Sequence, residues 1–163
     1  MAKRNSLQPA NTKLVGGLVL GVILVGFGVG LAAFNIAGSK AAEITMNGRP
    51  VSEAELALGQ EVYETQCAAC HGLEGEGQPN WKQPNAEGIY PAPPHTSEGH
   101  TWHHSDTQLL EIIAAGGSMP NSAMPGYADI LTEEERVAVL AYLKTFWGPR
   151  ESEFQQKVSQ QSP

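Results

Sequence analysis

The chain has 163 residues, enough for one ordinary domain with additional segments. Its formal net charge of −7 is unevenly divided, because residues 1–42 carry only basic charges and residues 43–163 are strongly acidic. The acidic balance argues against nucleic acid as a partner. It fits basic protein partners, and an acidic surface that serves only solubility is the alternative.

The first expected element is an uncharged apolar segment, residues 14–38. At about 1.5 Å per residue, a helix of this length crosses the roughly 30 Å core of a bilayer. Basic residues in segment 1–13 predict that this segment stays in the cytoplasm and that the rest of the chain lies on the outer, periplasmic side. A cleaved signal peptide is the alternative, but the apolar run is about twice as long as a signal core. We therefore predict a single transmembrane anchor in the cytoplasmic membrane.

Glycines recur along the predicted anchor at a spacing that allows close helix packing. Gly17 and Gly21 form one such pair, and Gly26 and Gly30 form another. A transmembrane helix of a partner protein is one interpretation. In a segment this rich in glycine, a chance spacing is the other.

After the anchor, the sequence predicts a linker at 39–51, a folded unit at 52–147 and a C-terminal tail at 148–163. The linker contains NGRP, which is typical of a turn. The tail is rich in Gln and Ser, a composition typical of disorder. We expect the functional site in the folded unit.

Three helices are expected in the folded unit, each beginning with a capping box, in which a Ser or Thr is followed by Glu or Gln three residues later. The pairs are Ser52 and Glu55, Ser105 and Gln108, and Thr132 and Glu135. A long segment rich in Gly, Pro and His separates the first two helices and has no strand pattern. Such a loop is unusual in a compact domain unless it wraps a large apolar cofactor.

The first helix leads directly into CAACH, in which Cys67 and Cys70 are the only cysteines of the chain and His71 follows at once. This is the pattern of haem c attachment, in which two thiols form thioethers with the haem and the imidazole becomes an iron ligand. A disulfide here would add little stability. A thioredoxin-like pair expects a βαβ context, and a zinc site would have to recruit a distant histidine. We predict one covalently attached haem c.

The unit from Ser52 to Trp147 resembles a class I (monohaem) cytochrome c. The matching stretches are LALGQEVYETQCAACHGLEGEG and MPGYADILTEEERVAVLAYLKTFW. The resemblance implies an all-α fold, a small cytochrome c fold wrapped around one covalent haem, preceded here by the single transmembrane helix. It also implies that an aromatic residue of the last helix, Tyr142, crosses the first helix at its small residue, Gly59.

The chain has two Met-Pro pairs, and the resemblance distinguishes between them. Met124 is followed by an aromatic residue, Tyr127, and by the cap of the last helix in the register of the family, whereas Met119 has Ser122 at the aromatic position. The resemblance therefore implies that His71 and Met124 are the axial haem iron ligands. It also places Tyr127 in the haem pocket and leaves Met119 as a packing residue.

A proline carbonyl often accepts the Nδ1 hydrogen of the proximal histidine in this family, and such a bond would fix the ring of His71. The stretch YPAPPH offers Pro91, Pro93 and Pro94, of which Pro93 is preferred. Glycines directly after the attachment motif are expected to let the chain turn tightly at the haem.

The stretch PPHTSEGHTWHHSD places four histidines close to Trp102; they are His95, His100, His103 and His104. The simplest interpretation is that Trp102 lines the haem pocket and that one or two imidazoles bond the haem propionates. Alternatives are a surface copper or zinc site and a histidine that replaces Met124 as iron ligand.

These features predict a membrane-anchored electron-transfer protein, not an enzyme, with its haem domain on the outer side of the cytoplasmic membrane. From the family, we expect a quinol-oxidising complex as the electron donor and a terminal oxidase or reaction centre as the acceptor. Two alternatives stay open: a fixed haem subunit of a larger respiratory or photosynthetic complex, and a haem sensor or enzyme with an open iron site.

Overall fold

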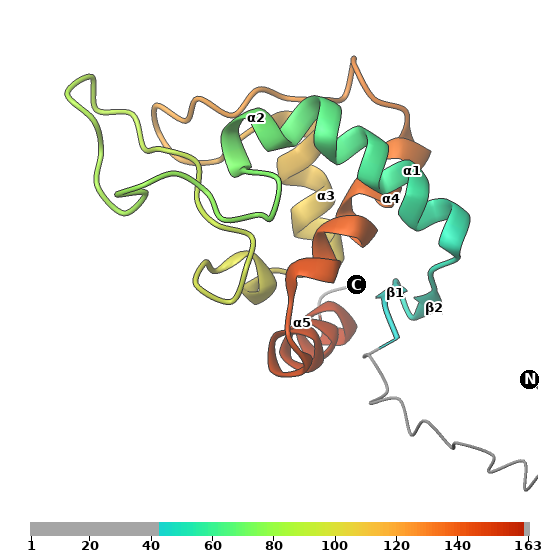
Figure 1. Ribbon diagram of the computed structural model, residues 1–163. Helices are drawn as coiled ribbons and strands as arrows, with labels where there is room; N and C mark the ends of the chain where they lie inside the picture. Colours follow the sequence, from blue (N-terminus) through green and yellow to red (C-terminus); the bar gives the residue numbers. More distant parts are fainter. Residues whose placement is uncertain (1–42, 162–163) are drawn as a thin grey trace, which may run out of the picture. The chain divides into compact units, whose positions relative to one another are not determined.

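The computed structural model describes residues 43–161, which are drawn in colour in Figure 1. The predicted anchor at 14–38 lies outside the described residues. Within 43–161, no helix is both long enough and apolar enough to cross a membrane. The elements in chain order are β1 (Thr45–Met46), β2 (Arg49–Pro50), α1 (Glu53–Val62), the π-helix η1 (Tyr63–Cys67), α2 (Ala68–His71), the 3₁₀-helix η2 (Thr101–His103), α3 (Asp106–Ala115), α4 (Glu133–Leu143), the 3₁₀-helix η3 (Lys144–Phe146) and α5 (Pro149–Gln161).

The three predicted capping boxes are all present, so the predicted starts of the three helices are confirmed. Ser52, Ser105 and Thr132 accept the backbone N–H three residues later, and the side chain of that later residue bonds back to the cap. Helix α4 ends at Leu143, and the chain continues as the tighter η3. These caps fix where α1, α3 and α4 begin.

Helices α1 and α4 cross at Gly59, as the resemblance implied. A Cβ at Gly59 would lie 2.0 Å from the carbonyl oxygen of Ala138 and 2.9 Å from the Cβ of Tyr142. Only glycine permits this approach. Tyr63, the first residue of η1, is fully buried beside the crossing and packs against the rings of Tyr142 and Phe146. The crossing thus supports the helical segment that carries the attachment motif.

Strands β1 and β2 form a short antiparallel hairpin inside the predicted linker. Asn47 and Gly48 make its turn with φ of 49° and 76°, the conformation that a two-residue hairpin favours. The turn is therefore confirmed, but the segment is not a free tether. Met46 is buried in the apolar core, and the backbone N–H of Asn47 donates to Asp106 Oδ2 at 3.1 Å.

The C-terminal tail is helical in the structure, so the prediction of disorder is wrong for residues 149–161. Helix α5 has few apolar side chains and is held by buried polar contacts. Gln155 is 2% exposed and donates from Nε2 to Asp106 Oδ1 at 2.6 Å and to His104 O at 3.3 Å. Composition alone indicated a solvated chain, because the polar partners lie far away in the sequence.

A buried ion pair joins these terminal elements. Lys144 Nζ lies 2.6 Å from Asp106 Oδ1 and also donates to the carbonyl oxygen of Thr45 at 2.7 Å. Burial acts to raise the pKa of Asp106, but the Lys144 charge and the hydrogen bonds outweigh it, and the pKa lies below its ordinary value. The hairpin, the start of α3, η3 and α5 therefore meet at one carboxylate.

Candidate haem-binding site

The attachment motif lies at the end of one continuous helical segment. The π-helix η1 interrupts the α-helical pattern between α1 and α2, and π-helical turns often occur at functional sites. Cys67 is half-buried and Cys70 is exposed, and both thiols are free. His71, the last residue of α2, is 8% exposed. Two thiols and an imidazole are thus presented at the end of this helical segment, Cys67 from η1 and Cys70 and His71 from α2.

The state of the Cys67 thiol bears on the alternatives to haem attachment. Burial, together with the nearby Cys70, raises the pKa of Cys67 to about 11. A redox-active Cys-x-x-Cys pair needs a lowered thiol pKa, so this geometry disfavours the thioredoxin-like alternative. Across residues 43–161, no group of three or more His, Cys, Asp or Glu side chains is arranged to hold a metal ion. The zinc and copper alternatives therefore have no ligand set in this part of the chain.

The loop after the motif, residues 72–100 together with η2 up to His104, is called the Pro93 loop. It turns back at once, because Gly72, Gly75 and Gly77 all have positive φ, as predicted for a tight turn. The N–H of Gly77 donates to the carbonyl oxygen of His71 at 2.7 Å. A Cβ on Gly77 would lie 2.5 Å from the nitrogen of Pro94 and 2.7 Å from the carbonyl carbon of Pro93. The loop therefore passes very close to His71 on its return.

This return brings the preferred proline to the predicted ligand. The carbonyl oxygen of Pro93 accepts from Nδ1 of His71 at 3.0 Å, so the expected hydrogen bond is present. Burial lowers the pKa of His71, and the bond to Pro93 opposes the shift only in part. The imidazole is therefore neutral at pH 7 with Nδ1 protonated, which leaves Nε2 as the nitrogen available to a metal.

His95 has a position that the sequence did not predict. Its ring stacks on that of His71, with centroids 4.1 Å apart and planes 21° apart. Its Nδ1 is hydrogen-bonded to Thr101 Oγ1, and its carbonyl accepts from Trp147 Nε1 at 2.9 Å. Burial, with His71 adjacent, lowers its pKa well below the usual value. The available signal was its place two residues after Pro93, where the chain must still run beside His71.

The remaining histidines are not gathered with His95. His100 stacks on Trp81 with ring centroids 5.9 Å apart, and His104 lies 5.6 Å from His100. His103 is exposed and contacts the rings of Trp102 and Phe154. The four-histidine stretch is therefore divided between two environments, one at His71 and one near the surface.

Trp102 provides a test of whether this chain fits a haem. Its ring packs against the apolar core cluster that contains Leu109 and Trp147. Among the buried side-chain nitrogen and oxygen atoms of residues 43–161, Trp102 Nε1 alone has no hydrogen-bond partner within the protein. A buried N–H without an acceptor is costly and rare in native proteins. A carboxylate carried by a bound haem supplies such an acceptor, so the residues present fit the group.

The segment 116–131, here called the Met124 strap, carries both Met-Pro pairs. The N–H of Gly117 donates to the carbonyl of Met124 at 3.2 Å, and the N–H of Tyr127 donates to that of Ile113 at 3.0 Å. Tyr127 also donates its hydroxyl hydrogen to the carbonyl of Gln66 at 2.9 Å, one residue before Cys67. Met124 is half-buried within this arrangement. Tyr127 thus connects the strap to the helix that carries the attachment motif.

Met119 lies in the exposed middle of the strap. Its side chain is 56% exposed, and the turn that follows it closes with a bond from Ser122 N to Met119 O. Asn121 has φ of 61° in that turn. The hydroxyl of Ser122, at the end of this turn, accepts from the N–H of Met124 at 3.2 Å.

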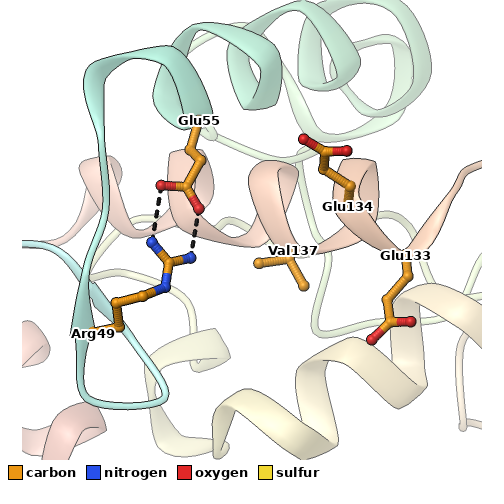
Figure 2. A pocket seen from close by; sticks show the side chains of 5 residues that line it. All are labelled: Arg49, Glu55, Glu133, Glu134 and Val137. Atoms are coloured by element: carbon orange, nitrogen blue, oxygen red, sulfur yellow. Dashed lines mark hydrogen bonds and ion pairs between the residues drawn. The ribbon is translucent and has the colours of Figure 1, made fainter.

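An open pocket of about 430 Å³ lies away from these residues, between the hairpin, α1 and α4 (Figure 2). Its lining residues are Arg49, Glu55, Glu133, Glu134 and Val137. Arg49 and Glu55 form an exposed ion pair there, drawn as dashed lines in Figure 2. None of the predicted haem-site residues lines this pocket, so it is separate from the attachment motif.

Comparison with known proteins decides the family. The family model described as cytochrome c matches residues 56–147, which include Cys67, Cys70, His71 and Met124. The chain belongs to the cytochrome c family. The family carries covalently attached haem c, and Cys67 and Cys70 fit its attachment site. This cytochrome is therefore a helical, class I electron-transfer protein.

Three curated relatives place this cytochrome among proteins of different size. A nitrite reductase of Stutzerimonas stutzeri is 29% identical over 137 residues, covering 80% of this chain and 20% of the relative. The cytochrome c subunit of a quinone alcohol dehydrogenase of Gluconacetobacter polyoxogenes is 31% identical over 97 residues, covering 55% of this chain and 19% of the relative. Cytochrome c of Chlamydomonas reinhardtii is 29% identical over 101 residues, covering 55% of this chain and 88% of the relative. The chain thus spans about a fifth of the length of the first two.

Proposed function

We propose that this protein is a membrane-anchored monohaem cytochrome c that carries single electrons on the outer face of the cytoplasmic membrane. In this proposal, His71 and Met124 are the axial iron ligands, and the protein is a carrier rather than an enzyme. Its donor is a quinol-oxidising complex, and its acceptor is a terminal oxidase or reaction centre. Segment 14–38 is the anchor.

The observation that carries the proposal is the hydrogen bond from His71 Nδ1 to the carbonyl oxygen of Pro93. His71 directly follows the attachment cysteine Cys70. A metal-binding histidine commonly donates its second ring N–H to a carbonyl or carboxylate, which fixes the ring and raises its basicity as a ligand. His71 is therefore prepared to bind iron through Nε2.

Met124 is favoured as the second ligand by the way its segment is bound. Its carbonyl accepts from the N–H of Gly117, just after the end of α3, and Tyr127 connects the strap to Gln66, beside the attachment helix. Met119 lies in the exposed turn and lacks such support. A thioether opposite an imidazole raises the reduction potential and leaves no iron position for a substrate.

Bound haem c supplies a one-electron Fe(III)/Fe(II) couple. The residues of the chain have other tasks. Cys67 and Cys70 would hold the group covalently, His71 and Met124 would bind its iron, and Trp102 offers a buried donor to a carboxylate. With both iron-binding residues retained, a change of oxidation state would need little rearrangement of the chain.

The partner assignment draws on charge and on the predicted anchor. Residues 43–163 carry six basic and 17 acidic residues, so the exterior domain attracts basic docking surfaces and repels acidic ones. An anchored carrier of this kind diffuses in the plane of the membrane between larger complexes. Association with the partner should then weaken as ionic strength rises.

The carrier assignment is tested with the full chain, matured with haem c and extracted in detergent. The reduced protein is expected to bind no CO at neutral pH and to release one electron per haem to an oxidant. Ready CO binding would point to the sensor or enzyme with an open iron site. Membrane fractionation tests the anchor: recovery in the soluble fraction without cleavage would contradict it.

A fixed subunit of a larger complex is the second candidate. It is favoured by the relatives in which the matched part is about a fifth of the protein, one of them named as the cytochrome c subunit of a dehydrogenase. Mild detergent purification distinguishes the two. A lone protein supports the carrier, and stoichiometric copurification with other subunits supports the fixed subunit.

A further inference from the structure

Helix α5 lies beyond the part of the chain that the cytochrome c family model matches, which ends at residue 147. It nevertheless packs against the segment that carries Trp102 (Figure 1). Phe154 of α5 presents its ring edge to the Trp102 indole, with centroids 5.4 Å apart and planes 89° apart. Edge-to-face pairs of this kind are favourable and fix the relative orientation of two rings.

A second contact fixes the backbone of the same segment. The buried amide of Gln155 donates to the carbonyl oxygen of His104, two residues after Trp102, and to the carboxylate of Asp106. The N–H of Asp106 in turn donates to Ser159 Oγ, also on α5, at 3.0 Å. Side chain and backbone around Trp102 are therefore both held by α5.

The indole N–H is the atom whose position these contacts determine. Within the described residues it is the buried polar atom that lacks a protein acceptor, and its acceptor in our functional proposal is a haem carboxylate. A hydrogen bond weakens steeply when its geometry departs from linear. A small rotation of the indole would therefore remove the bond.

We propose that α5 is a positioning element for Trp102, and that Phe154 and Gln155 hold the indole N–H in the orientation that bonds the carboxylate edge of the haem. This inference rests on the proposed function. Loss of the donor leaves the carboxylate charge less compensated, and a negative charge near the iron favours Fe(III). The reduction potential of this cytochrome is therefore set in part by a helix outside the family domain.

Phe154→Ala is the test variant, because Phe154 is 45% exposed and its replacement leaves the core in place. Gln160→Ala is the matched control on an exposed position of the same helix. Both are made in the full chain loaded with haem. We expect Phe154→Ala to change the equilibrium constant for reduction at least threefold toward Fe(III), a fall of about 30 mV for one electron. We expect no change in Gln160→Ala.

A double-mutant cycle separates positioning from a general structural effect. Trp102→Phe should lower the potential at least as much, and adding Phe154→Ala to it should cause no further change. In the reduced protein labelled with ¹⁵N-Trp, the indole resonance that Trp102→Phe removes should exchange its hydrogen at least tenfold faster in Phe154→Ala.

Three results are decisive. An unchanged potential in Phe154→Ala, or an equal further fall in the Trp102→Phe background, would overturn the positioning role. An absorption spectrum of wild type without histidine and methionine ligation would overturn the proposed function instead. Because the spectrum is recorded before any substitution, the two failures are distinguishable.

Discussion

The two segments that flank the attachment motif in space are held in different ways. The Pro93 loop is bound at several points along its length: to His71 by Gly77 and Pro93, to Gly75 by the N–H of His95, and to Trp147 through its indole. The Met124 strap is bonded on either side of its middle: Gly117 to Met124, Tyr127 to Ile113 and Gln66, and Leu131 to Arg136. Residues 118–123 between these bonds are all exposed.

For the proposed iron ligands, this difference predicts which one stays bound and which one can be exchanged. A segment that is bonded repeatedly beside a buried side chain such as His71 opens only with a large part of the fold, whereas an exposed segment opens locally at low cost. In the proposed ligation, His71 would therefore be the fixed ligand and Met124 the one that another molecule can replace.

The largest effect is expected where both segments share their support, at the crossing of α1 and α4. Gly59→Ala places a methyl group 2.0 Å from a backbone oxygen, and we expect it to lower the free energy of unfolding by about 3 kcal/mol. The Pro93 loop and the Met124 strap should both become less stable in this variant. Urea unfolding of the haem-loaded protein measures this. Ala57→Gly, exposed on the same helix, is the control and should cost about 1 kcal/mol. If the two substitutions lower the free energy of unfolding equally, the close approach of the helices at Gly59 is contradicted.

Gly77→Ala should affect the Pro93 loop alone. Its Cβ would meet Pro93 and Pro94, so we expect a loss of about 2 kcal/mol and faster hydrogen exchange at His71 Nδ1, seen by NMR of the reduced protein. Gly88→Ala is a matched control, because Gly88 also has positive φ, +78° against +69°, but its Cβ would meet nothing closer than 3.9 Å. The control should carry only the backbone cost, about 1 kcal/mol. If both variants change His71 equally, the close approach is not what fixes the ligand.

Tyr127→Phe should affect the Met124 strap alone. It removes the bond to Gln66, worth about 1 kcal/mol, so the strap should open about fivefold more often. The rate at which imidazole binds the ferric protein, limited by opening, should rise by the same factor. Tyr90→Phe, at an exposed position, should leave the rate unchanged. If the rate of imidazole binding is the same in Tyr127→Phe as in wild type, the bond to Gln66 does not hold the strap closed.

The smallest effect is expected at a site remote from both segments. Arg49, followed by the Ser52 cap, lowers the pKa of Glu55 to about 2 (Figure 2). Since the folded-state pKa lies below the ordinary value of 4.5, the ionised Glu55 stabilises the protein above that pH, and this stability is lost as pH falls toward 2. Glu55→Gln should lower the urea midpoint slightly at pH 7 and flatten its decline between about pH 5 and pH 2. If the urea midpoint of Glu55→Gln falls as steeply with pH as that of wild type, other carboxylates cause the loss of stability in acid.

Much of this cytochrome was predictable because its signals are local. Three capping boxes and the attachment motif each depend on residues within a few positions, and each is present in the structure. The crossing at Gly59 was implied by the resemblance to the family and is also present. Pro93 was chosen from the family's proline carbonyl at the proximal histidine, and the bond from His71 to Pro93 is present. The ligand role of Met124 stays a prediction.

The failures are non-local. Helix α5 reads as a disordered tail because its stabilising partners, Asp106 and the His104 carbonyl, lie about 50 residues away. The hairpin reads as a linker for the same reason, since its burial depends on Lys144 and Asp106. His95 reads as one of four equivalent histidines, and only the fold separates it from the others. Polar contacts between distant segments leave no periodic pattern in a sequence.

The most direct test of this account is the near-infrared absorption band of ferric haem with thioether ligation. It is recorded for the full haem-loaded chain in wild type, Met124→Leu and Met119→Leu. We predict that the band is present in wild type, lost in Met124→Leu and kept in Met119→Leu. Loss in Met119→Leu with retention in Met124→Leu would contradict the assignment of the strap and of the exchangeable ligand.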